Sequence, residues 1–476
     1  MILESERHEW FACKTGTGCE EEEMDFSGKQ VLVFGTGISG IAAAGLLQKR
    51  HANVVLFDGN DMLDENRVMA DFDDTDRISF YKGELPEEIK RDLDLVVLSP
   101  GIPVDLPLVR DMRDAGIPIW GEVELAFQCG KGSVLAITGT NGKTTTTSLL
   151  GEIMKHACGD VKVVGNIGIP YAGVADDMTD DTVTVAEISS FQLETIQDFC
   201  PDVSAVLNIT PDHLNRHHTM ENYVAAKMRI AENQNRDQVC VLNYEDDILR
   251  EKAEQISAGV IWFSSCRRLD TGLYLEGNHI FYADGKSDVK VIDTGELNIL
   301  GRHNYENVMA AVAMAISCGV PMERIRETLR TFQAVEHRIE YVTEKRGVRF
   351  YNDSKGTNPD AAVKGIQAMD RPTCLIGGGY DKDSEYTEWI NSFDGRVKLL
   401  VLIGQTREKI AAQAKACGFS DYVFADSLQE AVDLCYEKAK PGDAVLLSPA
   451  CASWGMFPNY EVRGKMFKEM VHALEE

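Results

Sequence analysis

Residues 134–147 have the sequence Val-Leu-Ala-Ile-Thr-Gly-Thr-Asn-Gly-Lys-Thr-Thr-Thr-Thr, and this stretch decides the fold. An apolar strand leads into a glycine-rich turn, and a lysine, a row of threonines and a helical pattern follow. This order is that of a P-loop, shortened so that the first glycine of the common form would fall at Ile137. Backbone N–H groups in such a turn and at the helix N-terminus bind phosphate oxygens. The sequence therefore predicts an ATP-binding loop.

The lysine and the threonine after it have separate expected roles. Lys143 is placed to reach the β- and γ-phosphates, and Thr144 to offer its hydroxyl to Mg²⁺. The backbone of the turn approaches the nucleotide as well. The ATP-binding residues predicted from this segment are Gly139, Thr140, Asn141, Gly142, Lys143, Thr144 and Thr145.

Apolar strands alternate with helical patterns on both sides of the loop, which predicts an α/β fold with parallel sheets covered by helices on both faces. Between Ile261 and Ile299, short alternating stretches broken by Gly and Asp predict a small antiparallel patch. The predicted strands are 31–34, 53–57, 95–98, 134–137 and 183–186, and, in a second series, 373–376, 399–403, 422–424 and 444–447.

The length of 476 residues is too great for one hydrophobic core and predicts about three domains at ~150 residues each. We place boundaries near Gly121 and Val335. The predicted organisation is a disordered extension at 1–24, a Rossmann-like domain at 25–121, a central P-loop ATPase domain at 122–334 and a C-terminal Rossmann-like domain at 335–476.

The composition argues against several classes of protein. Acidic residues outnumber basic ones by 76 to 48, so the net charge of −28 argues against nucleic-acid binding and anionic lipid. The sequence shows no apolar stretch long enough for a membrane span and no secretory signal. Its twelve cysteines have no metal-site spacing and suit a reducing compartment. We therefore expect a cytoplasmic protein, and we expect it to be a monomer.

A second glycine-rich turn precedes the P-loop. Residues 35–40, Gly-Thr-Gly-Ile-Ser-Gly, follow a strand and open an alanine-rich helix, and Asp58 closes the next strand. This pattern is typical of a site for NAD, FAD or a nucleotide sugar, or of close packing between strand and helix. An NAD-dependent dehydrogenase is disfavoured because hydride transfer does not need ATP. An enzyme that activates its substrate by phosphoryl transfer, or a P-loop regulatory ATPase, explains both loops better than a dehydrogenase does.

The residues of the P-loop, together with residues 187–194 (Glu-Ile-Ser-Ser-Phe-Gln-Leu-Glu), resemble the ATPase domain of the Mur ligases, and folylpolyglutamate synthases share the loop. The resemblance extends from about Asp25 to the C-terminus. Residues 352–360 (Asn-Asp-Ser-Lys-Gly-Thr-Asn-Pro-Asp) and 448–457 (Ser-Pro-Ala-Cys-Ala-Ser-Trp-Gly-Met-Phe) are similar to the D-glutamate-adding branch. The Gly35 turn with residues 99–103 (Ser-Pro-Gly-Ile-Pro) is similar to the D-glutamate and L-alanine adders.

This resemblance implies a reaction and its partners. ATP would phosphorylate the carboxylate of UDP-N-acetylmuramoyl-L-alanine, and the amine of D-glutamate would attack the acyl phosphate, leaving an amide, ADP and phosphate. The first domain would then hold the nucleotide sugar. A sister Mur ligase or a folylpolyglutamate synthase is the nearest alternative.

The resemblance also implies a site with two Mg²⁺ ions. Glu187 ends a strand, at the sheet edge where α/β proteins bind ligands, and would be a metal ligand beside Thr144. His213 follows another strand and would serve the second metal and the substrate. Lys227 would carry a carbamate derived from CO₂, which supplies an anionic oxygen ligand. The predicted catalytic residues are Lys143, His213 and Lys227.

The remaining site residues are also implied by the resemblance. For ATP they are Asn304, Arg338 and Asp353; for the UDP substrate Thr36, Asp58, Gly101, Asn166 and His213; and for D-glutamate Lys355, Thr357, Lys382, Ser453 and Tyr460. The family's basic residue after the Asp58 position is missing, since Gly59 and Asn60 follow. Gly455 stands where an acidic residue is frequent, and Tyr460 where some members have Phe.

Overall fold

The computed structural model describes residues 24–72, 74–333 and 336–475, and the chain divides into two compact units. Unit 1 comprises the described residues up to Ile292 together with Glu306–Thr328, and unit 2 comprises Asp293–Tyr305 and the residues from Leu329 onward. The predicted extension, apart from Met24, lies outside the described residues, and so does the predicted boundary at residues 334–335.

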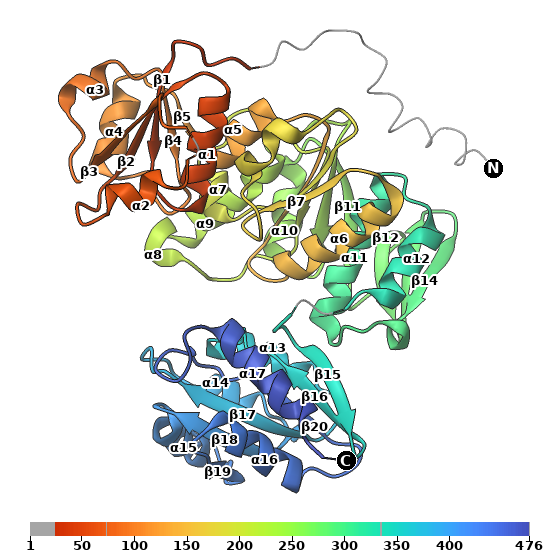
Figure 1. Cartoon of the computed structure of the whole chain (residues 1–476). Coiled ribbons are helices and arrows are strands. Elements are labelled where there is room, and N and C mark those ends of the chain that lie inside the picture. The colour runs from red at the N-terminus through yellow and green to blue at the C-terminus, as the bar shows by residue number, and fades with distance from the viewer. Residues whose placement is uncertain (1–23, 73, 334–335, 476) are drawn as a thin grey trace. The chain divides into compact units, whose positions relative to one another are not determined.

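The first part of unit 1 is a five-stranded parallel sheet in the order β3-β2-β1-β4-β5 (Figure 1). The helix after the first strand packs directly on the glycine turn that precedes it. A Cβ on Gly40 of this helix would lie 1.9 Å from the carbonyl oxygen of Gly35 in the turn. The strands are β1 (Gln30–Phe34), β2 (Asn53–Asp58), β3 (Ile78–Lys82), β4 (Leu95–Leu98) and β5 (Ile119–Gly121), and the helices are α1 (Ile38–Lys49), α2 (Glu65–Met69), α3 (Glu87–Arg91), α4 (Pro107–Asp114) and α5 (Glu122–Cys129).

A nine-stranded sheet forms the middle of the chain, in the order β14-β13-β12-β11-β10-β9-β6-β8-β7. Its pairs from β7 to β12 are parallel, and β12 pairs with β13 antiparallel. The strands are β6 (Ser133–Thr138), β7 (Val161–Gly165), β8 (Val183–Glu187), β9 (Val203–Val206), β10 (Val239–Asn243), β11 (Gly259–Ser264), β12 (Thr271–Glu276), β13 (His279–Asp284) and β14 (Asp288–Asp293). The helices are α6 (Lys143–Ala157), α7 (Ser190–Leu193), α8 (Leu214–His217), α9 (Met220–Met228), α10 (Asp247–Lys252), α11 (Arg302–Ser317) and α12 (Met322–Thr331).

The two sheets of unit 1 share buried apolar contacts. One core cluster contains Val33 and Leu56 from the first sheet and Ala136, Ala186 and Leu242 from the second. This continuous core fixes the glycine turn after β1 in relation to the P-loop after β6.

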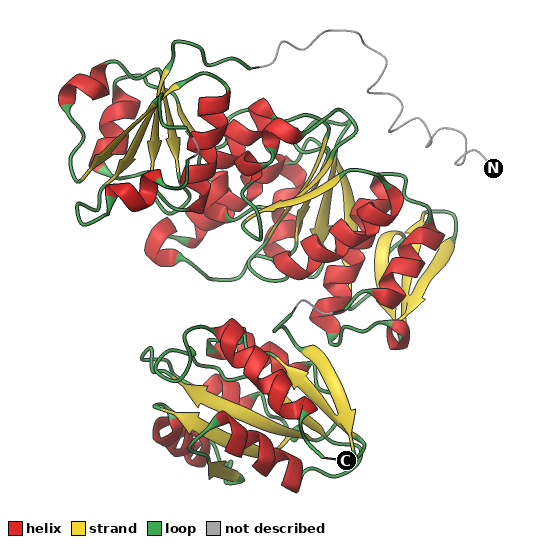
Figure 2. Ribbon diagram, viewed as in Figure 1, coloured by secondary structure: helices red, strands yellow, loops and turns green. Residues whose placement is uncertain are grey.

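Unit 2 has a six-stranded sheet in the order β15-β16-β20-β17-β18-β19, in which β15 is antiparallel to β16 and the other pairs are parallel. Two buried clusters line its two faces, and helices cover both (Figure 2). The strands are β15 (Glu340–Lys345), β16 (Val348–Asn352), β17 (Thr373–Gly379), β18 (Val397–Gly404), β19 (Tyr422–Phe424) and β20 (Ala444–Leu447), and the helices are α13 (Pro359–Gln367), α14 (Thr387–Asn391), α15 (Arg407–Ala416), α16 (Leu428–Lys438) and α17 (Tyr460–His472).

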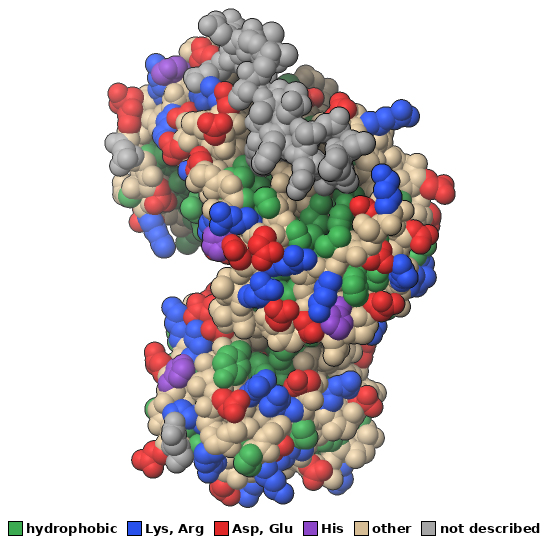
Figure 3. Space-filling model, turned by 90° about the vertical axis from the view of Figure 1, so that its right-hand side faces the viewer, with side chains coloured by type: hydrophobic (Ala, Val, Ile, Leu, Met, Phe, Trp, Pro, Cys, Tyr) green, Lys and Arg blue, Asp and Glu red, His purple; other side chains and the backbone are tan. Residues whose placement is uncertain are grey.

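The α/β prediction is confirmed, with parallel sheets in all three regions and the antiparallel patch at β12 and β13. Among the described residues, no helix combines the length and apolar character needed to cross a bilayer. Acidic and basic side chains are interspersed on the face shown in Figure 3 rather than gathered by sign.

Candidate active site

The P-loop lies at the carboxyl end of β6, between β8 and β9. Gly139 has a φ of 149° and Gly142 a φ of 88°, which side chains other than glycine rarely adopt. A Cβ on Gly142 would also lie 2.1 Å from Oδ1 of Asn307 on α11. Both positions therefore require glycine, for the backbone conformation and, at Gly142, for space as well.

Lys143 begins α6 and folds back over the turn. Its Nζ donates to the carbonyl oxygens of Gly139 at 2.8 Å and Thr140 at 3.1 Å. Gly142, the N-cap of α6, has no side chain to accept a hydrogen bond from the first helical N–H groups. The helix N-terminus thus combines backbone donors, a positive dipole end and an ammonium group, as a phosphate site requires.

Asn208, which is absent from the predicted site residues, holds the P-loop against the end of β9. Its Oδ1 accepts from the backbone N–H of Asn141 at 2.8 Å, and its Nδ2 donates to the carbonyl oxygen of Asn141 at 3.0 Å. Its carbonyl oxygen also accepts from the N–H of Thr140 at 2.9 Å. The signal in the sequence is a polar residue just after a buried strand, but the pairing with the loop comes only from the sheet order.

Glu187 ends β8, beside the P-loop strand in register with Ile137. It is buried, and its Oε1 accepts from Nδ2 of Asn166 at 2.8 Å. Among the described residues, its Oε2 has no hydrogen-bond partner. A buried carboxylate oxygen without a partner is costly unless it binds a cation.

Lys227 of α9 is buried at the same place. Its Nζ donates to the carbonyl oxygen of Gly139 at 2.9 Å and lies 4.7 Å from the centre of the Tyr223 ring. Burial, together with the nearby charge of Lys143, lowers the pKa of Lys227 from 10.5 to about 7, while Asp212 and Glu187 act in the opposite direction. A considerable share of this amine is therefore uncharged, and hence nucleophilic, near neutral pH.

His213 lies after β9 and is half exposed. Its ring packs edge-on against Phe191 of α7 with ring centres 4.9 Å apart, and its Nε2 lies 3.4 Å from Oδ2 of Asp212. His217, which is absent from the predicted site residues, is buried one turn later, and its Nε2 lies 2.9 Å from Oγ of Ser190. Burial lowers the pKa of His217 to about 4, so it stays neutral and packs as part of the core.

The residues present fit Mg²⁺ shared with a nucleotide rather than a metal held by protein alone. No group of three or more His, Cys, Asp or Glu side chains within the described ranges is placed to hold a metal. Mg²⁺ bound beside phosphates commonly needs only one or two carboxylates and a hydroxyl. Glu187, with its unpartnered oxygen, and Thr144 in the first turn of α6 provide that set.

In the first sheet, two of the predicted UDP-substrate residues lie together. Oδ2 of Asp58 accepts from the backbone N–H of Thr36 at 3.1 Å and from its hydroxyl at 2.9 Å. Gly101 lies in the loop after β4, whose Ser99 donates to the carbonyl oxygen of Gly35 at 3.2 Å. Asn166 instead lies beside Glu187 at the end of β7.

The predicted D-glutamate residues follow the carboxyl ends of β16, β17 and β20 in unit 2. The Nζ of Lys355 lies 5.4 Å from the centre of the Tyr460 ring, and that of Lys382 lies 4.7 Å from the Trp454 ring. The backbone N–H of Thr357 donates to the carbonyl oxygen of Lys355 at 2.8 Å, and Ser453 is buried beside Trp454. The described contacts thus form two clusters, one around each lysine.

Curated relatives match nearly the whole chain. It is 56% identical over 453 residues to UDP-N-acetylmuramoylalanine--D-glutamate ligase of Lachnoclostridium phytofermentans, and 54% identical over 451 residues to the protein of the same name from Lachnospira eligens. Both alignments cover 95% of this chain and 100% of the relative. The chain belongs to the Mur ligase family.

The Mur ligase assignment extends to each domain. Family models match residues 29–121 (Mur ligase MurD-like, N-terminal domain), 137–315 (Mur ligase middle domain) and 337–451 (Mur ligase, glutamate ligase domain). As a member of this family, the chain is an amino-acid ligase that uses ATP.

Solved structures of Mur ligases share the fold. UDP-N-acetylmuramate-alanine ligase MurC from Thermotoga maritima has a TM-score of 0.57 at 19% identity, covering 94% of this chain and 99% of that one. MurF from the same organism, in complex with ADP, has a TM-score of 0.56 at 16% identity, covering 94% and 96%. At these identities the likeness concerns the fold alone.

Asn304 and Asn307 of this Mur ligase lie one turn apart on α11 and have different partners. Asn304 belongs to unit 2, where its Nδ2 donates to the carbonyl oxygen of Leu300 at 2.7 Å. Asn307, which is not among the predicted residues, belongs to unit 1 and packs against Gly142 of the P-loop.

Asp353 follows β16 and is buried. Its Oδ2 accepts from Oγ of Ser448 at 2.6 Å, and a Cβ on Gly356 or Gly365 would lie within 2.8 Å of that oxygen. Burial raises the pKa of Asp353 from 3.8 to about 7, against the attraction of Arg338. The carboxylate is thus confined by backbone on one side and held by the Ser448 hydroxyl and a backbone hydrogen bond from Ile339.

We expect Asp353→Asn to raise the melting temperature of unit 2 at pH 8 by more than at pH 5.5. A folded pKa of about 7 against 3.8 unfolded corresponds to roughly 4 kcal/mol. Because the folded pKa is raised, this stability is present at low pH and is lost as pH rises towards 7. The uncharged amide of the variant avoids that loss. Its stabilisation over the wild type should therefore be about half as large at pH 5.5 as at pH 8. Calorimetric scans at both pH values measure the melting temperatures. An equal increase over the wild type at both pH values would contradict the burial of the charge.

Proposed function

We propose that this Mur ligase joins D-glutamate to UDP-N-acetylmuramoyl-L-alanine, using ATP, in the cytoplasmic synthesis of peptidoglycan precursors, and that it acts as a monomer. The identity of 46–56% to relatives named UDP-N-acetylmuramoylalanine--D-glutamate ligase, over their full length, carries this proposal. The MurD-like first domain agrees with it.

The reaction requires activation of a carboxylate, which is a poor electrophile. The carboxylate attacks the γ-phosphorus of ATP, which forms an acyl phosphate and releases ADP. The amine of D-glutamate then attacks the acyl carbon, loses a proton, and phosphate leaves. The P-loop N–H groups and Lys143 would hold the phosphate oxygens, on which negative charge collects.

Glu187, Thr144 and Lys227 would hold Mg²⁺, with His213 near the second ion. When bound, the metal neutralises charge on the phosphates and aligns them. The unpartnered Oε2 of Glu187 supports this role. For Lys227, the lowered pKa leaves an uncharged amine that can add to CO₂ with loss of a proton, which converts it into an anionic carbamate ligand.

The substrates would lie at the other predicted residues. Lys355 and Lys382 offer cations to the two carboxylates of D-glutamate, with Thr357, Ser453 and Tyr460 around them. The UDP-linked substrate would contact Thr36, Asp58, Gly101, Asn166 and His213. Asn304, Arg338 and Asp353 would contact ATP, as the resemblance to the Mur ligases implies.

A substrate comparison tests the proposal. Phosphate release and amide product are measured with magnesium-ATP while D-glutamate, L-alanine or L-glutamate is offered with UDP-N-acetylmuramoyl-L-alanine, UDP-N-acetylmuramate or a folate. We expect product only from D-glutamate with UDP-N-acetylmuramoyl-L-alanine. Product from another pair would indicate a sister ligase or a folylpolyglutamate synthase, and ATP turnover without an amide would indicate a regulatory ATPase.

A further inference from the structure

Arg338 lies in a turn whose backbone is strained on both sides. His337 has a φ of 69° and Ile339 a φ of 47°. Residues with a side chain rarely adopt this region, and for β-branched Ile339 it is especially unfavourable. Such a conformation persists only where surrounding contacts hold it in place. The direction of the Arg338 side chain therefore depends on whatever fixes this turn.

The contacts that fix the turn converge on Glu340, the first residue of β15. Its Oε2 accepts from the backbone N–H of His337 at 3.0 Å and from Nδ2 of Asn352 at 2.9 Å. Asn352 is buried, stands opposite Glu340 in the β15–β16 pairing, and also lies 2.9 Å from Nδ1 of His337. One carboxylate thus links the strained turn to the central part of the sheet.

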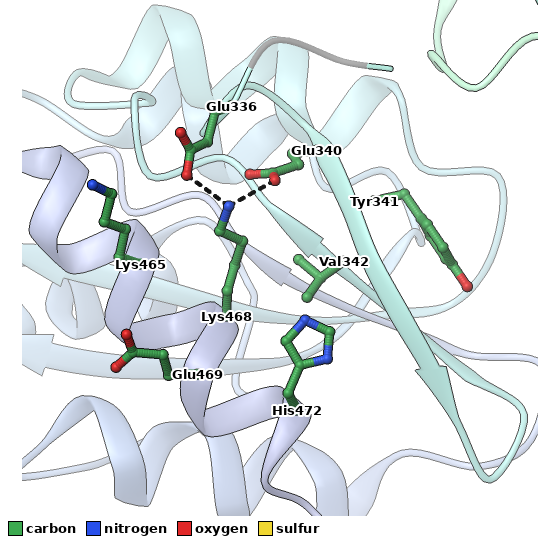
Figure 4. Close-up of a pocket in the computed structure, with 8 residues that line it drawn as sticks. All are labelled: Glu336, Glu340, Tyr341, Val342, Lys465, Lys468, Glu469 and His472. Atoms are coloured by element: carbon green, nitrogen blue, oxygen red, sulfur yellow. Dashed lines mark hydrogen bonds and ion pairs between the residues drawn. The ribbon is translucent and has the colours of Figure 1, made fainter. Parts of the chain in front are cut away.

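Lys468 of α17 joins the carboxylates on either side of the turn. Its Nζ lies 2.7 Å from Oε1 of Glu336 and 2.9 Å from Oε1 of Glu340, and Figure 4 shows the ammonium between them. The Lys468 side chain is 22% exposed and that of Glu340 is 18% exposed, so this pair is shielded from water far more than a surface pair. The three residues line a cavity of about 330 Å³.

The same α17 begins at Tyr460, beside which Lys355 lies. The backbone N–H of Lys355 donates to the carbonyl oxygen of His337 at 3.0 Å. Arg338 acts electrostatically on both Asp353 and Tyr460. These contacts connect the turn to the start of α17 and to predicted site residues of unit 2.

We propose that Lys468 is a positioning residue that holds the 336–340 turn and thereby fixes the direction of Arg338. The inference rests on the proposed contact between Arg338 and ATP. Lys468 acts only through the two glutamates that flank the turn and touches no substrate.

Replacement of Lys468 by methionine tests this role, because methionine keeps most of the side-chain length and removes the charge. We expect the KM for ATP to rise about three- to tenfold, roughly the effect of losing one ordinary hydrogen bond, while the KM for D-glutamate stays within about twofold. Lys468→Arg should restore most of the ATP affinity, because a guanidinium also bridges two carboxylates.

Lys465→Met is the matched control. Lys465 lies one turn earlier on α17 and lines the same cavity, and Figure 4 joins it to neither carboxylate. This variant should leave both KM values unchanged. A general effect of lost charge in the cavity would instead appear in both variants.

A double-mutant cycle with Arg338→Lys separates positioning from simple stability. If Lys468 acts through Arg338, the Lys468→Met change should raise the KM for ATP little further once Arg338 is replaced. A lower melting temperature with an unchanged KM for ATP would overturn the inference, and so would additive effects. Calorimetric titration with ATP gives the same comparison without turnover. An active wild-type enzyme with an unaffected Lys468→Met variant refutes only this inference, whereas a wild type that forms no amide refutes the proposed function.

Discussion

Replacement of Lys143 by methionine should lower kcat by at least about 10³-fold, the loss expected when a cation that stabilises a transferring phosphoryl group is removed. The side chain is held over the P-loop by the carbonyl oxygens of Gly139 and Thr140, at 2.8 and 3.1 Å, so its charge is already in place before ATP binds. A preorganised charge costs no rearrangement in the transition state, which is why its removal is severe. Phosphate release with both substrates measures the effect.

Lys155→Met is the control for this prediction, because Lys155 lies on the same helix, is half exposed and is paired with Glu152 at 2.8 Å. It should keep wild-type kcat and melting temperature. A Lys143→Met enzyme within tenfold of wild type would show that the loop does not hold the transferring phosphate.

The strands of the parallel sheets were predictable because they are buried on both faces. β4 (Leu95–Leu98) and β20 (Ala444–Leu447) are continuous apolar runs, and the structure reproduces both predicted ranges. β3 (Ile78–Lys82) and β15 (Glu340–Lys345) are edge strands with polar residues and partly exposed side chains, so neither apolar runs nor clean alternation marks them. The helices α11 and α12 are separate because Gly319 takes a left-handed conformation and Pro321 cannot continue α11.

The residues of the candidate site also fall into those that the sequence could predict and those that it could not. Motif residues such as Lys143 and Glu187 are recognisable because the chemistry requires a given side chain at a given strand or helix end. Asn208 and Lys468 act through contacts with residues 67 and 128 positions away, and such pairings depend on sheet order and on how α17 packs. Local pattern carries no information about them.

Lys227→Ala should lower kcat by about 10²- to 10³-fold, because it removes a predicted metal ligand beside the phosphates. The wild-type amine is buried, with its pKa lowered to about 7 by burial and by Lys143. That environment favours the uncharged amine that reacts with CO₂. In ¹³C-bicarbonate, the wild-type protein should show a carbamate carbon signal by NMR, and Lys227→Ala should lack it.

Lys227→Arg decides between two roles that alanine cannot separate. In the structure Lys227 donates to the carbonyl oxygen of Gly139 at 2.9 Å, so the alternative role is to brace the P-loop as a cation. Arginine keeps the charge and the donors but does not form a carbamate under these conditions. If the carbamate is the functional group, Lys227→Arg should be as inactive as Lys227→Ala, with and without added bicarbonate. Substantial activity in the arginine variant would instead assign Lys227 to the loop and leave Glu187 and Thr144 as the metal ligands.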